Sequence, residues 1–221
     1  MKAVELNNVC KKYGSRVILK GVSFFVDDGE LVALIGPSGC GKSTILNMIG
    51  VLETVDQGEI RIFGKILPPI DSHRATLMRR DTINYLFQSF ALINDMTVCQ
   101  NLLLSMHFLS RSDKDKMESI DQMLNAVHLL PLKNATVNTL SGGEQQRVAL
   151  ARTMLKPGKL ILADEPTGSL DAHSADISFS LIQSLCKKYG KTVIMVTHSP
   201  ELAQRADRII DLTEFRQGQS Q

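Results

Sequence analysis

Nine consecutive residues early in the chain have the types and spacing of a phosphate-binding loop. They read Gly-Pro-Ser-Gly-Cys-Gly-Lys-Ser-Thr and fit the pattern G-x-x-x-x-G-K-[ST]. The glycines let backbone N–H groups turn inward around phosphate oxygens, and the following helix N-terminus adds partial positive charge. Lys42 is expected to reach the terminal phosphates and Ser43 to ligate Mg²⁺. The residues predicted to bind the nucleotide here are Gly36, Ser38, Gly39, Cys40, Gly41, Lys42, Ser43 and Thr44.

The sequence on both sides of this loop supports the same interpretation. Leu31–Ile35 is an apolar run with the length of a buried strand, and Ile45–Ile49 begins a helical pattern. An ordinary glycine-rich turn between strand and helix is the alternative, but it does not require the Lys-Ser pair. The sequence therefore predicts that the chain binds a nucleotide.

Two adjacent acids follow another apolar run. Leu160–Ala163 is strand-sized, and Asp164 and Glu165 come directly after it. Acids at the carboxyl end of a parallel strand lie where α/β proteins bind ligands, which makes a merely solvated acidic turn the weaker interpretation. Phosphoryl transfer to water needs one acid near Mg²⁺ and one that orients and polarises the water. We predict that Asp164 takes the first role and Glu165, as general base, the second.

Strand-sized apolar runs recur along the chain and indicate the sheet that must position these groups. Most lack the alternation of a half-exposed strand, which is typical of a buried, largely parallel sheet. A smaller antiparallel sheet is expected from Val4–Val9 and Val22–Val26, to which Glu59–Phe63 can be added. The runs expected in the parallel sheet are Val32–Ile35, Ile83–Phe87, Leu160–Ala163, Val193–Val196 and Ile209–Leu212.

Helical periodicity replaces the strand signals over Phe90–Lys156. The clearest helix has Ser112 as N-cap and Asp115 three residues on, and it ends before Pro131. The sequence thus predicts a helical lobe inserted into an α/β core. The polar end, Gln217–Gln221, is expected to be unstructured.

Composition excludes several classes of protein. The 221 residues, 43% of them hydrophobic, suffice for one large α/β domain. The four cysteines have no C-x-x-C pair, so we expect a reducing cytosol and neither a zinc site nor a disulfide framework. A formal charge of +2 and the lack of tryptophan argue against nucleic acid as a partner. We expect no signal peptide, and because no apolar run reaches the roughly 18 residues of a membrane span, membrane contact is expected only through a partner.

A second informative stretch, Leu140–Arg147, reads Leu-Ser-Gly-Gly-Glu-Gln-Gln-Arg. A serine hydroxyl and glycine N–H groups that open a helix offer donors and a positive dipole to an anion. An ordinary N-capped helix start is the alternative. With the phosphate-binding loop upstream, this stretch resembles the signature of the ATP-binding cassette (ABC) ATPases. The resemblance covers nearly the whole chain and implies that the nucleotide is ATP.

Other segments stand in the order that the ABC family requires. Gln88 resembles the Q-loop glutamine that contacts Mg²⁺ and water, and Ser169-Leu170-Asp171 resembles the D-loop at the dimer interface. His198 resembles the switch histidine that contacts the γ-phosphate, and Tyr13 matches the aromatic residue that stacks on adenine. Each residue alone also has a purely structural interpretation. The resemblance implies catalysis by Glu165, His198, Lys42 and Gln88, Mg²⁺ binding by Ser43, Gln88 and Asp164, and ATP contacts by Tyr13, Ser141, Gly143 and Asp171.

The same resemblance implies the architecture and the partners. It predicts one ABC ATPase domain over 1–221, with a P-loop NTPase (RecA-like) core, an N-terminal antiparallel β subdomain and an inserted α-helical subdomain. The core and β subdomain are expected over 1–88 and 157–221, and the helical subdomain over 89–156. It also implies a homodimer on ATP binding, in which the P-loop of one copy and Ser141 of the other sandwich each ATP. Integral membrane permease subunits are expected to hold this dimer at the cytoplasmic face of the membrane.

Within the family the chain is most similar to the ATPase subunits of the macrolide-exporter and lipoprotein-release group. Asn84 stands where a glycine is usual before the Q-loop, and Gln100 where a Glu-Asn pair is common, both near the lobe expected to dock a permease. The expected function is ATP hydrolysis that powers a separate permease of exporter type, for a peptide, antibiotic or lipoprotein. Force transmission to an extracytoplasmic protein without transport, and a soluble non-transport ABC ATPase, are the alternatives.

Two further expectations concern an apolar cluster and one cysteine. The apolar residues Phe90, Leu92, Ile93 and Met96 form either a groove for a cytoplasmic helix of the permease or the helical lobe's own core. Cys40, at a helix N-terminus, is expected to react with alkylating reagents unless ATP protects it.

Overall fold

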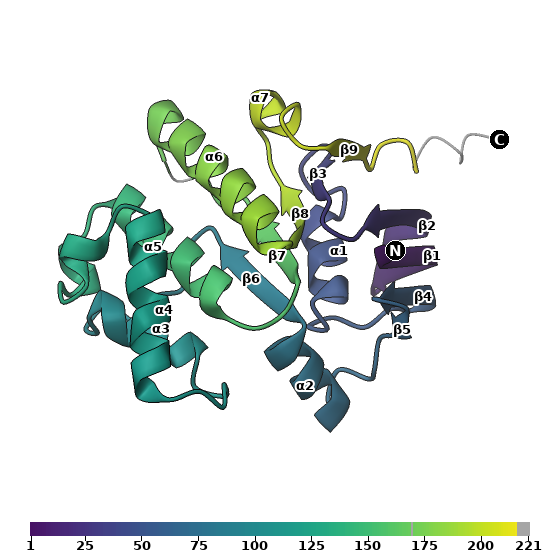
Figure 1. Cartoon of the computed structure of the whole chain (residues 1–221). Helices are drawn as coiled ribbons and strands as arrows, with labels where there is room; N and C mark the ends of the chain where they lie inside the picture. Colours follow the sequence, from purple (N-terminus) through teal and green to yellow (C-terminus); the bar gives the residue numbers. More distant parts are fainter. Residues whose placement is uncertain (169, 216–221) are drawn as a thin grey trace.

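Two sheets organise the chain. The structure is a computed structural model that describes residues 1–168 and 170–215. Ser169 of the expected D-loop and the polar end 217–221 lie outside the described residues. Figure 1 shows the parallel sheet in the middle, the antiparallel sheet on the right and a group of helices on the left.

The five predicted apolar runs form one parallel sheet, as expected. Its order is β6-β7-β8-β3-β9, and all neighbouring strands are parallel. Because the strands run in one direction, their carboxyl ends meet at one edge, where ligands bind in open α/β sheets. The bounds are Leu31–Ile35 for β3, Ile83–Phe87 for β6, Leu160–Asp164 for β7, Thr192–Val196 for β8 and Arg208–Asp211 for β9.

Alternate residues of the parallel strands face two separate cores. On β7, Leu160 and Leu162 pack with α1 (Lys42–Ile49) and the antiparallel sheet, whereas Ile161 and Ala163 pack with the helices of the opposite side. Strands β3 and β8 divide in the same way. Side chains of a strand alternate between its faces, so the residue after Ala163 points back toward α1.

The antiparallel sheet has the order β2-β1-β4-β5. Its strands are β1 (Lys2–Tyr13), β2 (Arg16–Asp27), β4 (Gln57–Ile62) and β5 (Lys65–Ile66). The β1–β2 hairpin is longer than the predicted runs, because register shifts along it interrupt the hydrophobic alternation by which strands are recognised. The two-residue β5, which pairs with β4, carries too little pattern to be predicted.

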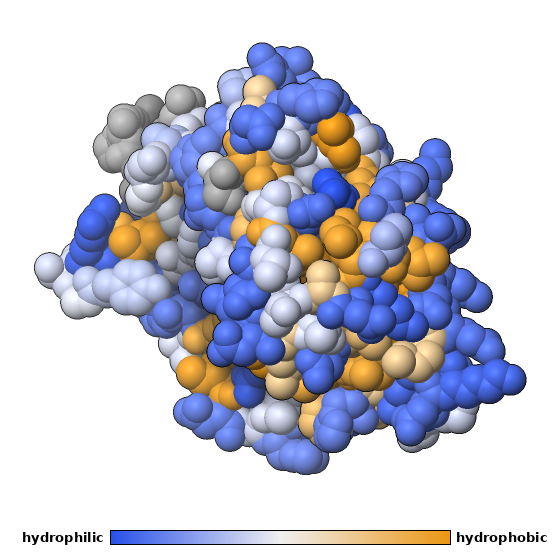
Figure 2. Space-filling view, turned by 90° about the vertical axis from the view of Figure 1, so that its left-hand side faces the viewer, coloured by the Kyte–Doolittle hydropathy of each residue, from blue (hydrophilic) through white to orange (hydrophobic). Residues whose placement is uncertain are grey.

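The predicted helical lobe consists of α3 (Val98–Ser105), α4 (Asp113–Ala126) and α5 (Gly142–Leu155), with short 3₁₀ turns at Leu130–Leu132 and Val137–Thr139. Ser112 caps α4 as predicted, accepting a hydrogen bond from the Asp115 N–H at 3.1 Å. Figure 2 looks onto the side of the molecule that carries this lobe, where apolar side chains reach the surface in separate patches among hydrophilic ones.

The remaining helices are α2 (His73–Asp81), α6 (Ala172–Tyr189) and α7 (Pro200–Ala203). Within the described residues, no helix has the length and apolar character to cross a membrane.

Candidate nucleotide-binding site

The loop between β3 and α1 has the glycine-dependent shape that the sequence predicts. Gly36, Gly39 and Gly41 have φ angles of 145°, 72° and 104°, which L side chains rarely adopt. A Cβ atom on Gly36 would lie 2.8 Å from Cys40 Sγ, and one on Gly41 would lie 2.6 Å from Leu19 Cδ2. The loop leads into the N-terminus of α1, whose first N–H groups have no partner within the helix. Both features suit a bound phosphate.

Lys42, the first residue of α1, turns its side chain back over the loop. It is 6% exposed, and its Nζ atom donates hydrogen bonds to the carbonyl oxygens of Gly36 at 2.8 Å and Pro37 at 3.1 Å. A buried ammonium among backbone groups attracts an anion more strongly than an exposed one, because water screens it less. This placement suits the role predicted for Lys42.

Ser43 and Asp164 meet where the alternation along β7 puts them. The Ser43 hydroxyl donates to Asp164 Oδ1 across 3.5 Å. Burial raises the pKa of Asp164, as does the nearby charge of Glu165, while the Ser43 hydrogen bond and Lys42 oppose the rise. A buried carboxylate is stabilised by a cation, and hydroxyl and carboxylate oxygens are ligands that Mg²⁺ prefers. The pair therefore fits the Mg²⁺ site predicted from the sequence.

Glu165 leaves the sheet through a left-handed turn with φ of 46°. Such a conformation persists only where its surroundings hold it; the Glu165 N–H donates to Val196 O at 3.1 Å, and the Gly168 N–H donates to Glu165 O at 3.0 Å. The turn brings Glu165 Oε1 to 3.0 Å from Nε2 of His198, which follows β8. The predicted general base and the predicted switch histidine are thus in contact.

Gln88 follows β6, and its side chain lies near the Glu165 carboxylate. A Cβ atom on Gly168 would lie 3.2 Å from Gln88 Nε2 and 3.3 Å from Glu165 Oε2. The Gln88 amide and the Glu165 carboxylate therefore lie on either side of the space that a side chain at Gly168 would occupy. The structure places the predicted Q-loop residue next to the predicted base.

Ser141 is the N-cap of α5, so the ordinary-cap interpretation is right for its local structure. The Ser141 hydroxyl accepts a hydrogen bond from the Glu144 N–H at 3.4 Å, and Glu144 Oε2 accepts one from the Ser141 N–H at 2.8 Å. The Ser141 hydroxyl also donates to Glu144 Oε2 at 2.7 Å, and this bond, together with the one from the Ser141 N–H, holds the pKa of Glu144 below its usual value. The S-x-x-E spacing is the sequence signal for this capping box. Within residues 1–168 and 170–215, no hydrogen bond links Ser141 to the P-loop of its own chain.

Asp171 is likewise a cap, at the start of α6. Its Oδ1 atom accepts a hydrogen bond from the Ser174 N–H at 3.0 Å, and this bond lowers the pKa of Asp171. A Cβ atom on Gly142 would lie 3.8 Å from Leu170 Cδ2. The expected D-loop and the signature helix are therefore neighbours within one chain.

Tyr13 lies at the end of β1 with its ring partly exposed. Its hydroxyl donates to Glu53 Oε2 at 3.0 Å, and the Lys11 ammonium lies 5.4 Å from the ring centroid. Lys11 is itself paired with Glu53 at 2.7 Å. A ring anchored in this way can offer a flat face to a base. No spacing in the sequence indicates Glu53.

The structure corrects the expectation for the Cys40 thiol. Cys40 is 1% exposed, and its side chain belongs to the core beside α1. A buried thiol is inert toward alkylating reagents whatever the helix dipole does to it, so ready alkylation of Cys40 is the wrong expectation. The role predicted for Cys40 in the P-loop therefore depends on its backbone groups and not on its thiol.

Two departures from the family pattern have local hydrogen-bond partners. Asn84 on β6 is fully buried, and its Nδ2 atom donates to Gly158 O at 3.2 Å. Gln100 completes a capping box with Thr97 at the start of α3. Asn84 and Gln100 therefore each serve the structure of the chain itself, at positions near the lobe expected to dock a permease.

Comparison with known protein families agrees with this geometry. The profile of a family described as "ABC transporter" matches residues 19–168 of the chain. The chain belongs to the ABC transporter family. The matched range contains the P-loop, the Q-loop glutamine, the signature and the acidic pair of an ABC ATPase.

Two curated ABC proteins confirm the predicted similarity to the exporter and lipoprotein-release group. The chain is 40% identical over 218 residues to the lipoprotein-releasing system ATP-binding protein LolD of Anaeromyxobacter dehalogenans, which covers 96% of this chain and 91% of LolD. It is 35% identical over 209 residues to the macrolide export ATP-binding/permease protein MacB of Campylobacter jejuni, which covers 95% of this chain and 32% of MacB. The chain thus spans about a third of the length of that relative.

Solved ABC cassettes share the fold. The dimeric structure of the bacterial ABC transporter cassette MJ0796 matches with a TM-score of 0.83 and 38% identity, covering 94% of this chain and 93% of that one. A second dimeric structure of MJ0796, in a post-hydrolysis state bound to ADP and Pi, matches with a TM-score of 0.81. The chain is therefore an ABC-type ATPase cassette, and the predicted fold class is confirmed.

Sequence reasoning missed one buried contact of this ABC site. Gln146 on α5 is 2% exposed, and its Nε2 atom donates to the carbonyl oxygen of Pro166, directly after Glu165. A hydrogen bond thus links the predicted signature helix to the turn that follows the predicted base, Glu165. The residue falls inside the signature, but no spacing rule predicts which carbonyl it meets.

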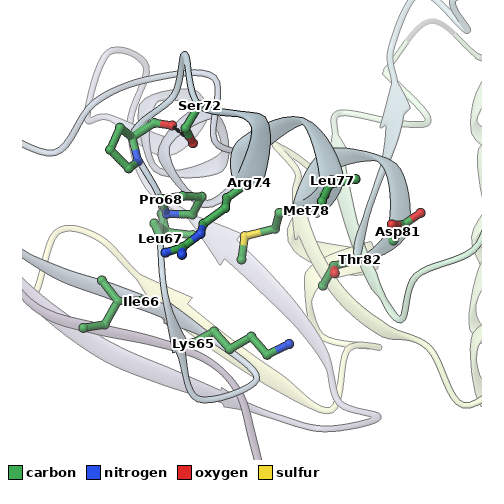
Figure 3. Close-up of a pocket in the computed structure, with 11 residues that line it drawn as sticks. Lys65, Ile66, Leu67, Pro68, Ser72, Arg74, Leu77, Met78, Asp81 and Thr82 are labelled. Carbon is green, nitrogen blue, oxygen red and sulfur yellow. Dashed lines mark hydrogen bonds between the residues drawn. The ribbon is translucent and has the colours of Figure 1, made fainter.

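The pocket in Figure 3 lies away from the ABC site. It has a volume of 870 Å³, and in Figure 3 Arg74 and Met78 of α2 face the segment with Leu67 and Pro68. It contains none of the predicted site residues. A separate pocket of 410 Å³ includes Glu165, Gly168 and His198. The predicted base and the predicted switch histidine thus line a smaller pocket than the one in Figure 3.

Proposed function

We propose that this chain hydrolyses ATP with Mg²⁺ as a homodimer and powers a separate integral membrane permease. The observation that carries the proposal is that two pairs of side chains are in contact beside the P-loop. Ser43 lies 3.5 Å from Asp164, and Glu165 lies 3.0 Å from His198. The first pair suits a Mg²⁺-bound phosphate and the second suits the attack of water. The arrangement thus supports hydrolysis rather than nucleotide binding alone.

Each residue has a distinct role in this reaction. Lys42 neutralises the terminal phosphates, and Glu165 orients the attacking water and takes its proton. His198 holds the Glu165 carboxylate and faces the γ-phosphate. Ser43, Asp164 and the Gln88 amide oxygen would hold Mg²⁺, which when bound offsets charge on the phosphate oxygens.

A second copy of the chain completes each site. Ser141 is exposed at the start of α5 and makes no described hydrogen bond to its own P-loop. We assign Ser141, Gly143 and Asp171 to the ATP held by the P-loop of the other copy. The dimeric form of the related MJ0796 cassette supports this assignment.

The partner belongs to the exporter type of permease. The relatives are named for macrolide export and lipoprotein release. On that basis we expect a peptide, antibiotic or lipoprotein substrate, selected by the permease. The chain then lies at the cytoplasmic face of the membrane and contacts it through the permease.

We place the permease contact in a groove beside α3. This groove has a volume of 390 Å³, and its lining includes three exposed apolar residues, Leu52, Phe87 and Leu104. Of the four apolar residues suggested by the sequence, Phe90 and Leu92 pack against the lobe's own core. The groove also has cationic walls, which suits an amphipathic helix that carries acidic groups; these are Arg79, Arg152 and Lys156.

Leu104→Asp is expected to separate docking from hydrolysis. Leu104 is 49% exposed, so the change leaves the fold intact, but it puts a charge into an apolar contact. We expect normal ATPase activity of the isolated chain and at least tenfold less co-purification with the permease from detergent-solubilised membranes, equivalent to about 1.4 kcal/mol. Leu130→Asp, at a site 39% exposed outside the groove, is the control. Equal co-purification of the two variants would count against this docking site.

The proposed reaction is tested by steady-state ATPase assays of the purified chain. We expect phosphate release with Mg²⁺, at a specific activity that rises with protein concentration because two copies form each site. Chelation by EDTA is expected to abolish turnover while a fluorescent ATP analogue still binds. Turnover that is unaffected by EDTA, or no turnover at any protein concentration, would contradict the proposal.

A further inference from the structure

The chain turns sharply after Gln88 through two left-handed residues that are not glycine. Phe90 and Ala91 have φ angles of 60° and 50°. The Phe90 N–H donates to Phe87 O at 3.1 Å and the Ala91 N–H to Ser89 O at 2.6 Å, but these two bonds lie within the turn and tie it to no other element. Such a backbone persists where the surrounding structure holds it.

Arg152, near the end of α5, provides that hold. Its Nη2 atom donates to Phe90 O at 2.9 Å, and its Nη1 atom donates to Ala91 O. A planar guanidinium presents two donors at a fixed spacing, which matches two successive carbonyls, whereas a lysine ammonium is a point donor. In the described part of the chain no carboxylate forms an ion pair with Arg152. The guanidinium is therefore committed to the Q-loop turn.

The helix that carries Arg152 begins at the signature serine. Helix α5 has 14 residues, and Ser141 and Arg152 lie roughly 16 Å apart at the rise of an α-helix. Its middle is buried over Val148–Ala151. Arg152 and this helix therefore form a continuous connection from the Q-loop turn to the helix N-terminus.

We propose that Arg152 is a positioning residue that locks the Q-loop to the signature helix, so that Gln88 and Ser141 move together. The position of Gln88 then depends on the ATP bound by its own chain. Through Arg152 the same change moves Ser141, which contacts the ATP bound by the other copy. Loss of the clamp uncouples the two motions and leaves the P-loop unchanged. This inference rests on the proposed function, since it requires two ATP sites shared between copies.

The test replaces the two-pronged donor with a point donor. In a Glu165→Gln background, Arg152→Lys is expected to weaken ATP-driven dimerisation roughly tenfold, the effect of one lost hydrogen bond from a charged group. With Glu165 intact, kcat should fall by a similar factor, while the affinity of the monomer for a fluorescent ATP analogue stays unchanged. Arg79→Lys is the matched control, because Arg79 Nη1 also donates to two carbonyls outside the Q-loop turn, Val51 O at 2.8 Å and Ile70 O at 3.1 Å. Arg79 lines the proposed permease groove, as Arg152 does, but dimerisation and kcat are measured here without a permease.

The possible outcomes separate coupling from stability. Dimerisation and kcat of Arg152→Lys equal to the parent would overturn the inference, as would equal losses in Arg152→Lys and Arg79→Lys that follow their Tm values. Adding Ala91→Gly to Arg152→Lys relieves the left-handed strain and protects folding. We expect this double variant to regain Tm but not dimerisation, and recovery of both would reduce Arg152 to a purely structural role. If the parent Glu165→Gln chain itself does not dimerise on ATP, the proposed function fails and the coupling fails with it.

Discussion

Glu165→Gln is expected to lower kcat by roughly 10²- to 10⁴-fold and to leave ATP binding intact. Glutamine has the size of glutamate, so it still fits beside Gly168 and can still meet His198, which lies 3.0 Å from Glu165. It cannot accept the proton of the attacking water. The expected loss corresponds to about 3 to 5 kcal/mol of transition-state stabilisation. Single-turnover phosphate release and the binding of a fluorescent ATP analogue measure the two properties separately.

A nearby acid provides the control for this variant. Glu201 is exposed on α7 and lines the same pocket as Glu165 and His198. Glu201→Gln makes the same change of charge without removing the proposed base, so its kcat should stay within about twofold of the parent, a difference under 0.5 kcal/mol. Turnover of Glu165→Gln near the parent rate would rule out Glu165 as the base.

Lys42→Met is expected to abolish tight ATP binding, with an affinity loss of at least about 100-fold. Methionine approximates the lysine stem but carries no charge. Two hydrogen bonds from a charged group to phosphate contribute about 3 kcal/mol or more. Because the Lys42 ammonium is buried, water does not replace it. Titration with a fluorescent ATP analogue measures the loss, and hydrolysis at moderate ATP should fall with it.

Lys191→Met separates this effect from the loss of a buried lysine in general. Lys191 is 9% exposed, and its ammonium also donates to two carbonyl oxygens, those of Lys156 and Gly158. It precedes β8, at the amino edge of the parallel sheet. We expect Lys191→Met to lower Tm by an amount similar to Lys42→Met and to bind ATP normally. Equal ATP affinities of the two variants would remove Lys42 from the site.

The fold was largely predictable because its information is local. Buried parallel strands read as apolar runs, and the P-loop, the acidic pair and the signature follow recognisable spacings. The lobe helix at Ser112 was predictable from its cap. The two-residue β5 and the register-shifted β1–β2 hairpin were not, since neither gives a regular period.

The polar network around the site was harder to predict. Sequence motifs named Glu165 and His198, but their 3.0 Å contact depends on the left-handed turn at Glu165, for which no residue type is a signal. The bonds from Gln146 to Pro166 O and from Arg152 to the Q-loop turn join residues distant in sequence. The burial of Cys40 could not be predicted from the sequence either. The motif suggested a reactive thiol, but packing makes the thiol inaccessible. Long-range packing, rather than local pattern, decides such contacts.

The central claim is that two copies of this chain share each ATP. Its most direct test is the mass of the Glu165→Gln chain by size-exclusion chromatography with light scattering, with and without ATP. The chain has a mass of 24.4 kDa, and we predict a doubling of this mass on ATP addition. The doubling should disappear when Ser141 is also replaced by arginine, since Ser141 is assigned to the ATP of the other copy. A mass that stays at 24.4 kDa with saturating ATP would contradict the account.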